Sequence, residues 1–158
     1  MTFTDSIKSC LNKYATFRGR APRSEYWWFW LFCVLVYITL TLAFGLIGYL
    51  CGDEKGMLVA IRIGVVVYYL MLFLPILSVM VRRLHDVGSS GWESFVCVGS
   101  LILSVLEETG YNLAKNLDSW SWLTIVIVSI IVFGFLLRLL VLLLKDSDEE
   151  NQYGLPVY

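Results

Sequence analysis

The chain has little charge, a single histidine and no paired cysteines. Only 16% of its 158 residues are Asp, Glu, Lys or Arg, against roughly 25% in an average soluble domain. The net charge is −1, which excludes nucleic-acid binding through a basic surface. With His85 alone and four cysteines outside any C-x-x-C spacing, no haem site, zinc ribbon or redox pair is encoded. We therefore predict no metal and no cofactor, and we expect the cysteines to be small buried apolar residues.

Apolar residues, by contrast, are abundant and lie in long runs. They make up 58% of the chain, and the mean hydropathy is +0.73. Several runs exceed the length of about 18 residues that predicts a transmembrane helix. This composition excludes an ordinary soluble enzyme and a disordered chain. We expect one membrane domain over residues 1–158 with short loops, since a separate soluble domain needs at least about 50 residues.

Four apolar runs predict four transmembrane helices, and the fold class is an all-α membrane protein, a four-span transmembrane helical bundle. The approximate bounds of the spans are 26–50, 57–81, 92–107 and 120–144, and a cytoplasmic tail follows at 145–158. Arg62 and Pro75 lie in the second run, which a span tolerates by snorkelling and by kinking. The third run is shorter than the usual span of about 17–25 residues. We expect it to cross, with a re-entrant segment as the alternative.

Basic residues are distributed unevenly around these spans. Four spans place both termini and the loop after the second span on one side of the membrane. That side holds eight Lys and Arg residues near the span ends, and the other side holds two. Because short loops rich in Lys and Arg stay in the cytoplasm, we expect a multi-pass protein of the bacterial inner membrane with both termini cytoplasmic.

A short helix is expected before the first span. Apolar residues recur there at helical spacing, at Phe3, Ile7, Cys10, Leu11 and Tyr14, and polar residues fall on the other side of the helix. This pattern is typical of a helix that lies in the membrane interface. The alternative is that the apolar stripe packs against the cytoplasmic ends of the spans.

Three polar motifs fall on the predicted cytoplasmic side. They are F-x-G-R-x-x-R-x-E-Y-W at residues 17–27, R-R-L-H-D at 82–86 followed by Gly91 and Trp92, and N-x-Y-G at 151–154. In these motifs the chain resembles the small bacterial inner-membrane proteins grouped as domain of unknown function 805. The resemblance implies a helical membrane fold over nearly the whole chain and brings no established activity.

The arginines of the first two motifs are candidates for a ligand site. If the segment that enters the first span is helical, Arg20 and Arg23 lie one turn apart, at the level of the lipid headgroups. Their guanidinium groups suit an anionic phospholipid or another small anion. The alternative is that these charges only set the topology, beside the aromatic residues of the interface. Glu25, an acid at the membrane edge, is best explained by a pair with Arg82 or Arg83.

His85 and Asp86 are the most catalytic-looking pair, because an imidazole relays protons near neutral pH. Adjacent residues point apart on a helix, however, and no nucleophile has an evident orienting partner. We expect His85 to bond a backbone carbonyl, and Asp86 either to cap the following turn or to pair with an arginine. The acidic tail should fold back toward the arginines and place Tyr153 near the R-R-L-H-D loop.

These observations favour a non-enzymatic integral membrane protein whose cytoplasmic polar layer binds an anionic lipid or a small ligand, or docks a partner. The candidate residues of the layer are Arg20, Arg23, Glu25, Arg82, Arg83, His85, Asp86, Asn151 and Tyr153. A homo-oligomer and a membrane-protein partner both stay open. A second hypothesis is a small oligomeric transporter or channel that uses Arg62 or Arg138, the charges inside the spans. A third is a membrane-embedded enzyme that uses His85 and Asp86.

Overall fold

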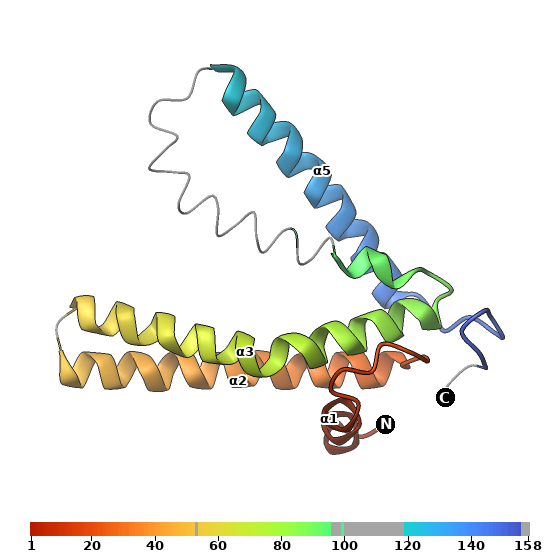
Figure 1. Ribbon diagram of the computed structural model, residues 1–158, viewed down its shortest axis with the longest axis horizontal. Helices are drawn as coiled ribbons and strands as arrows, with labels where there is room; N and C mark the ends of the chain where they lie inside the picture. The colour runs from red at the N-terminus through yellow and green to blue at the C-terminus, as the bar shows by residue number, and fades with distance from the viewer. Residues whose placement is uncertain (53, 96–98, 100–118, 156–158) are drawn as a thin grey trace.

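The computed structural model describes residues 1–52, 54–95, 99 and 119–155. Its elements are α1 (Phe3–Asn12), α2 (Arg23–Cys51), α3 (Glu54–Asp86), the 3₁₀ turn η1 (Gly91–Ser94) and α5 (Ser119–Leu144). Figure 1 shows α2 and α3 as an antiparallel hairpin, with α1 lying across it near the end where α2 begins and α3 finishes. The last turns of α5 meet the hairpin at that same end, and the rest of α5 leans away. All of the described elements are helical, which confirms the predicted all-α class for this part of the chain.

Within the part of the chain that the structure describes, two helices are long and apolar enough to cross a membrane, Arg23–Leu50 and Lys55–Asp86. At about 1.5 Å per residue, the 29 residues of α2 and the 33 residues of α3 extend about 43 and 50 Å. They correspond to the predicted spans 26–50 and 57–81. The predicted span 120–144 corresponds to α5. The predicted third span, 92–107, lies outside the described residues apart from η1 and two positions beyond it.

The two long helices approach each other through glycine at the end of the hairpin where they are joined. A Cβ atom added at Gly48 would lie 2.6 Å from the Cα of Met57 and 2.8 Å from the Cβ of Ala60. A Cβ at Gly64 would lie 3.0 Å from the ring of Phe44. Close backbone approach of this kind lets helices associate in a lipid environment, where there is no hydrophobic gain from contact between helices.

Pro75 interrupts the hydrogen bonds of α3, and a residue from the N-terminal segment replaces the missing donor. Proline has no N–H, so the carbonyl of Met71 loses its helical partner. The hydroxyl of Tyr14 donates to that carbonyl at 2.7 Å. Nearby, the hydroxyl of Ser78 donates to the carbonyl of Thr16 at 2.8 Å. The segment after α1 is thereby fixed to α3.

Helix α1 packs by one face against the hairpin. It begins after Thr2, whose hydroxyl accepts the N–H of Asp5 as a helix cap. Ser6 and Cys10 on its inner face are fully buried. Burial raises the pKa of the Cys10 thiol to about 12, so this thiol stays protonated at neutral pH. The helix expected before the first span is confirmed, and the structure shows the packing against the long helices.

The buried core lies at the same end of the hairpin as α1. We call this end the polar end, and we call the hairpin between residues 34 and 71 the shaft. The core cluster consists of Cys10, Ala21, Tyr26, Phe29, Cys33, Leu72, Val79, Met80, Leu84, Leu139 and Leu143. Cys10 and Cys33 are buried, as expected. Cys97 and the side chain of Cys51 lie outside the described part of the chain.

Candidate functional site

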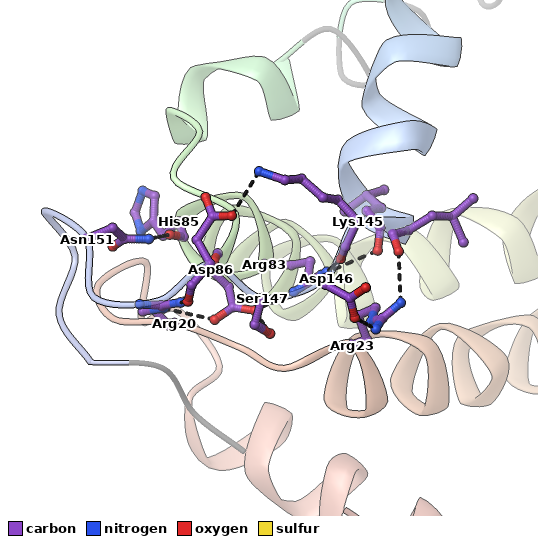
Figure 2. A network of polar contacts seen from close by, with 12 residues as sticks. Arg20, Arg23, Arg83, His85, Asp86, Lys145, Asp146, Ser147 and Asn151 are labelled. Atoms are coloured by element: carbon purple, nitrogen blue, oxygen red, sulfur yellow. Dashed lines mark hydrogen bonds and ion pairs between the residues drawn. The ribbon is translucent and has the colours of Figure 1, made fainter.

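The polar end is organised around Asp86, the last residue of α3, whose side chain is fully buried. Its Oδ1 accepts the Nε of Arg20 at 2.8 Å, and its Oδ2 accepts Arg83 Nη1 and the hydroxyl of Ser147. Figure 2 shows Asp86 between these partners, which come from the loop before α2, from α3 and from the tail after α5. A buried carboxylate requires such compensation of its charge.

Arg20 makes hydrogen bonds with all three nitrogens of its side chain inside the protein. Besides the bond from Nε to Asp86, its Nη1 donates to the carbonyls of Glu149 and Gly154 at 2.8 and 2.7 Å. Its Nη2 donates to the carbonyls of Asp86 and Asp148. A guanidinium has five N–H donors, and five acceptors are present. Arg20 therefore fastens the tail and has no donor left for a ligand.

Two other arginines hold the end of α5. Arg83 Nε donates to the carbonyl of Leu143 at 3.3 Å, and Arg23 Nη1 donates to the carbonyl of Leu144 at 3.0 Å. The last carbonyls of a helix lack intrahelical donors and carry the negative end of the helix dipole. Positive side chains therefore stabilise this end of α5. Arg23, whose side chain is 45% exposed, also pairs with Asp146.

A third buried ion pair joins α2 to α3. Arg82 Nη1 donates to Glu25 Oε1 at 2.8 Å, and both side chains are at most 2% exposed. The same oxygen accepts the hydroxyl of Ser9 at 3.0 Å and the thiol of Cys10 at 3.6 Å. The expected pair of Glu25 is thus confirmed, and Arg82 is its partner. Among the described residues, Nε and Nη2 of Arg82 are buried without a hydrogen-bond partner.

His85 is held by the first and third motifs. Its Nδ1 lies 3.2 Å from the carbonyl oxygen of Gly19. Its ring stacks on Tyr153, with ring centres 3.9 Å apart and planes 9° apart. Asn151 Nδ2 donates to the carbonyl of His85 at 3.0 Å, and Asn151 Oδ1 accepts the N–H of Tyr153 at 2.9 Å. The expected carbonyl contact of His85 and the return of the tail to R-R-L-H-D are both confirmed.

Two local expectations were wrong. The R-R-L-H-D motif is not a loop but the last turns of α3, which runs to Asp86 before Gly88, with φ +72°, reverses the chain. Arg20 does not share a helix with Arg23, because Pro22 is extended and α2 begins only at Arg23. Of the two alternatives for Asp86, the structure shows pairing with arginine.

A groove of about 440 Å³ lies beside His85, and sequence reasoning missed it. Its lining is mainly apolar and aromatic and includes Phe17, Leu77, Val81, His85, Trp92 and Tyr153. A Cβ added at Gly91 would lie 2.7 Å from Val81 Cγ1, so glycine allows η1 to pack closely on α3. The spacing of Leu77, Val81 and His85, four residues each, was the signal that could have grouped these residues on one face.

Ser147 and Glu93 also contribute contacts that were not anticipated. Ser147 belongs to the charged tail, where nothing distinguishes it from a solvated serine. Glu93 of η1 accepts a bond from Arg138 Nη2 of α5 at 3.1 Å, and the side chain of Arg138 is 63% exposed. This contact engages one of the two arginines that the transporter hypothesis would use.

Comparison with known proteins identifies relatives in the bacterial inner membrane. A family model described as "Protein of unknown function (DUF805)" matches residues 14–155. Inner membrane protein YhaH of Escherichia coli (strain K12) is 38% identical over 103 residues, which cover 60% of this chain and 77% of that protein. Inner membrane protein YhaI of the same strain is 37% identical over 83 residues, 52% and 62% of the two chains. No solved structure matches. These relatives and the two long apolar helices support an inner-membrane location.

Proposed function

We propose that this chain, which belongs to the DUF805 family of proteins of unknown function, is a non-enzymatic, multi-pass membrane protein that binds anionic phospholipid at its cytoplasmic face. The observation that carries the proposal is a division among the basic residues of the polar end. Arg20, which the sequence offered as a ligand residue, is saturated by the chain itself. Lys8, Lys13 and Arg18 are exposed.

The exposed basic residues lie at the level expected for headgroups. Helix α3 exceeds the hydrocarbon core of about 30 Å by about 20 Å, so one part of it lies outside the core. Tyr14 contacts the carbonyl of Met71, which is about 22 Å from the Asp86 end of the helix. Trp27 and Trp28 lie at the start of α2, and tryptophan is typical of membrane interfaces. Helix α1 and the loop after it therefore border the lipid headgroups.

Electrostatics favours an anionic lipid at this level. No described carboxylate forms an ion pair with Lys8, Lys13 or Arg18. Two acids of the tail, Asp146 and Asp148, pair with Arg23 and Lys145. Each basic residue near an anionic membrane surface contributes about 1 kcal/mol of attraction. Three such residues suffice for a preference over a zwitterionic lipid. The buried arginines then serve to hold α5 and the tail in place.

The contacts of Asp86 support a non-enzymatic protein. Both of its oxygens accept hydrogen bonds from buried or half-buried donors, Arg20 and Arg83 among them. These donors occupy the positions at which the carboxylate would accept a proton. Asp86 is therefore poorly suited to act as a general base beside His85.

The test is the retention of lipid by the full chain in native mass spectrometry, after extraction from nanodiscs of equimolar phosphatidylglycerol and phosphatidylcholine. We expect a preference for phosphatidylglycerol that K13Q and R18Q each reduce by about fivefold, as a loss of about 1 kcal/mol requires. The control is K55Q, an exposed lysine at the other end of the hairpin, which should leave the preference unchanged. Equal retention of the two lipids by the unmodified protein would refute the proposal.

The orientation has its own test. Reporters that are active only in the cytoplasm, fused in turn to the first and the last residue, should both be active. A reporter placed beside Lys55, between α2 and α3, should be inactive. Activity at that position would place the basic residues of α1 on the outer side of the membrane. The proposed binding of anionic phospholipid at the cytoplasmic face would then be refuted.

A further inference from the structure

We infer that the groove beside His85 binds one acyl chain of a membrane lipid whose headgroup carries a hydroxyl group, and that this hydroxyl donates to His85 Nε2. The inference rests on the proposed function for one premise, the position of α1 and the carbonyl of Met71 at the headgroup level. It adds a site and a chemical class of ligand, and its test uses an uncharged lipid.

The groove continues the lipid-facing surface of α3. Leu70, Leu74, Leu77 and Val81 recur at spacings of four, three and four residues, so they share one helical face. Leu70 is 76% exposed and Leu74 is 42% exposed, whereas Val81 is only 8% exposed because the groove walls cover it. An acyl chain that lies along the exposed leucines can therefore extend into the groove without leaving an apolar surface.

The groove lies outside the hydrocarbon core, where an empty apolar lining would be exposed to water. From Met71, which marks the headgroup level, Leu77 and His85 are about 9 and 21 Å farther along α3. Apolar walls at this distance from the hydrocarbon core would face water if they were left open. Trp92 and Phe95 on the far wall are 76% and 51% exposed, and exposed apolar surface of this kind is typical of ligand sites and interfaces.

The size and lining of the groove suit an amphiphile. Its volume of about 440 Å³ falls within the range of about 300–1,000 Å³ of small-molecule sites, which are mostly apolar with a few placed polar groups. Here the polar groups are few, namely His85, Ser90 and the hydroxyl of Tyr153. No arginine or lysine lines the groove among the described residues. The ligand part inside it is therefore uncharged.

The hydrogen bond of His85 defines the chemistry of the headgroup. Because a carbonyl only accepts hydrogen bonds, the contact with Gly19 assigns the proton of the neutral imidazole to Nδ1. Nε2 is then an acceptor. It lies on the groove side, 3.2 Å from where a Cβ of Gly91 would be, and no described residue donates to it. A hydroxyl of a glycerol headgroup provides the missing donor, whereas a choline headgroup has none.

The experiment measures binding of monooleoylglycerol, a neutral lipid with one acyl chain and a hydroxylated head, to the full chain by native mass spectrometry. We expect one molecule bound, and we expect L77W to weaken binding by at least about tenfold, because the indole fills the groove. The control is L42W, which adds the same side chain at a 68% exposed position of α2 that does not line the groove and should change little. Unchanged binding by L77W would overturn the inference.

A second variant tests the hydroxyl contact without filling the groove. H85N retains an amide N–H for the carbonyl of Gly19 and removes the Nε2 acceptor. The unmodified protein should prefer monooleoylglycerol to methyl oleate, which lacks a hydroxyl, and H85N should lose this preference while still binding both chains. If the two lipids bind equally to the unmodified protein, the assignment of His85 is overturned.

Two further readouts separate this site from the proposed function and from a protein ligand. K13Q and R18Q should bind monooleoylglycerol normally, so the loss of phosphatidylglycerol preference and the loss of the groove are independent results. If L77W instead abolishes a dimer while monooleoylglycerol never binds, the groove is a contact between copies of the chain and the inference fails. The helix content of each variant, measured by circular dichroism, shows whether it has folded.

Discussion

The shaft and the polar end are built in opposite ways. In the shaft, large apolar side chains face outward, with Leu42 and Leu70 exposed by 68% and 76%, and glycine lies between the helices. At the polar end, Arg83 and Asp86 are fully buried, and ion pairs and hydrogen bonds to backbone carbonyls satisfy them. The difference shows that two kinds of contact stabilise the fold. Close backbone packing joins helices within the lipid, and buried ion pairs join segments where they leave it.

The largest effect should come from D86A, which removes the shared partner of Arg20 and Arg83. Two buried guanidinium groups would then lack their carboxylate, and breaking a buried pair costs about 3–5 kcal/mol. We expect loss of the folded protein in detergent, measured by thermal unfolding and size-exclusion chromatography. The control is E93Q, which removes the exposed pair with Arg138 and should cost at most about 1 kcal/mol. Similar losses in the two variants would contradict the importance of burial.

The shaft should be destabilised by steric overlap between its helices, and not by the loss of an ion pair. In G48L, the new side chain meets the backbone of Met57, which is not free to rotate away. Forcing atoms into a packed contact costs about 1–3 kcal/mol, so we expect a lower unfolding temperature and separation of α2 from α3. The control is G134L in α5, where an added Cβ has no neighbour within 4 Å. If G134L is equally damaging, the loss reflects added bulk in lipid and not the close approach of the helices.

Tyr14 connects the polar end to the shaft, because its hydroxyl donates to the carbonyl of Met71, the last residue of the shaft. Y14F leaves the carbonyl of Met71 without its donor, and an unsatisfied polar group of this kind costs about 1–3 kcal/mol. In the background of P75A, which restores an N–H for the same carbonyl, Y14F should cost much less. Unfolding measured for the two single variants and the double variant gives this coupling directly. Strict additivity would show that Tyr14 does not compensate for the proline.

The shaft could be predicted from the sequence far better than the polar end. A long uncharged apolar run predicts a membrane-spanning helix and little else. The predicted bounds of α2 and α5 therefore lie within three residues of the observed ones. The end of α3 was misplaced because the charges of R-R-L-H-D resemble a solvated loop, and only their buried partners allow the helix to continue. Opposite charges did predict the pair of Glu25 and the return of the tail.

Other contacts of the polar end left weaker signals or none. Pro75 could have indicated that the carbonyl of Met71 needs another donor, although not that Tyr14 would supply it. The bonds from Arg20 to the carbonyls of the tail could not have been foreseen, because every residue offers a carbonyl. Sequence patterns identify which side chains carry charge, whereas backbone acceptors become specific only after the chain has folded.

The smallest effect separates buried from exposed arginines within the polar end. Arg23 is 45% exposed and holds the tail only through Leu144 and Asp146, so R23Q should weaken the attachment by at most about 1 kcal/mol, about fivefold in the fraction of open tail. R20Q should open the tail far more, because it removes bonds to three tail carbonyls. The rate of limited proteolysis in the tail measures both. Equal rates of proteolysis for R23Q and R20Q would contradict this prediction. They would show that burial adds nothing to the contribution of an arginine, and that only its charge matters for holding the tail.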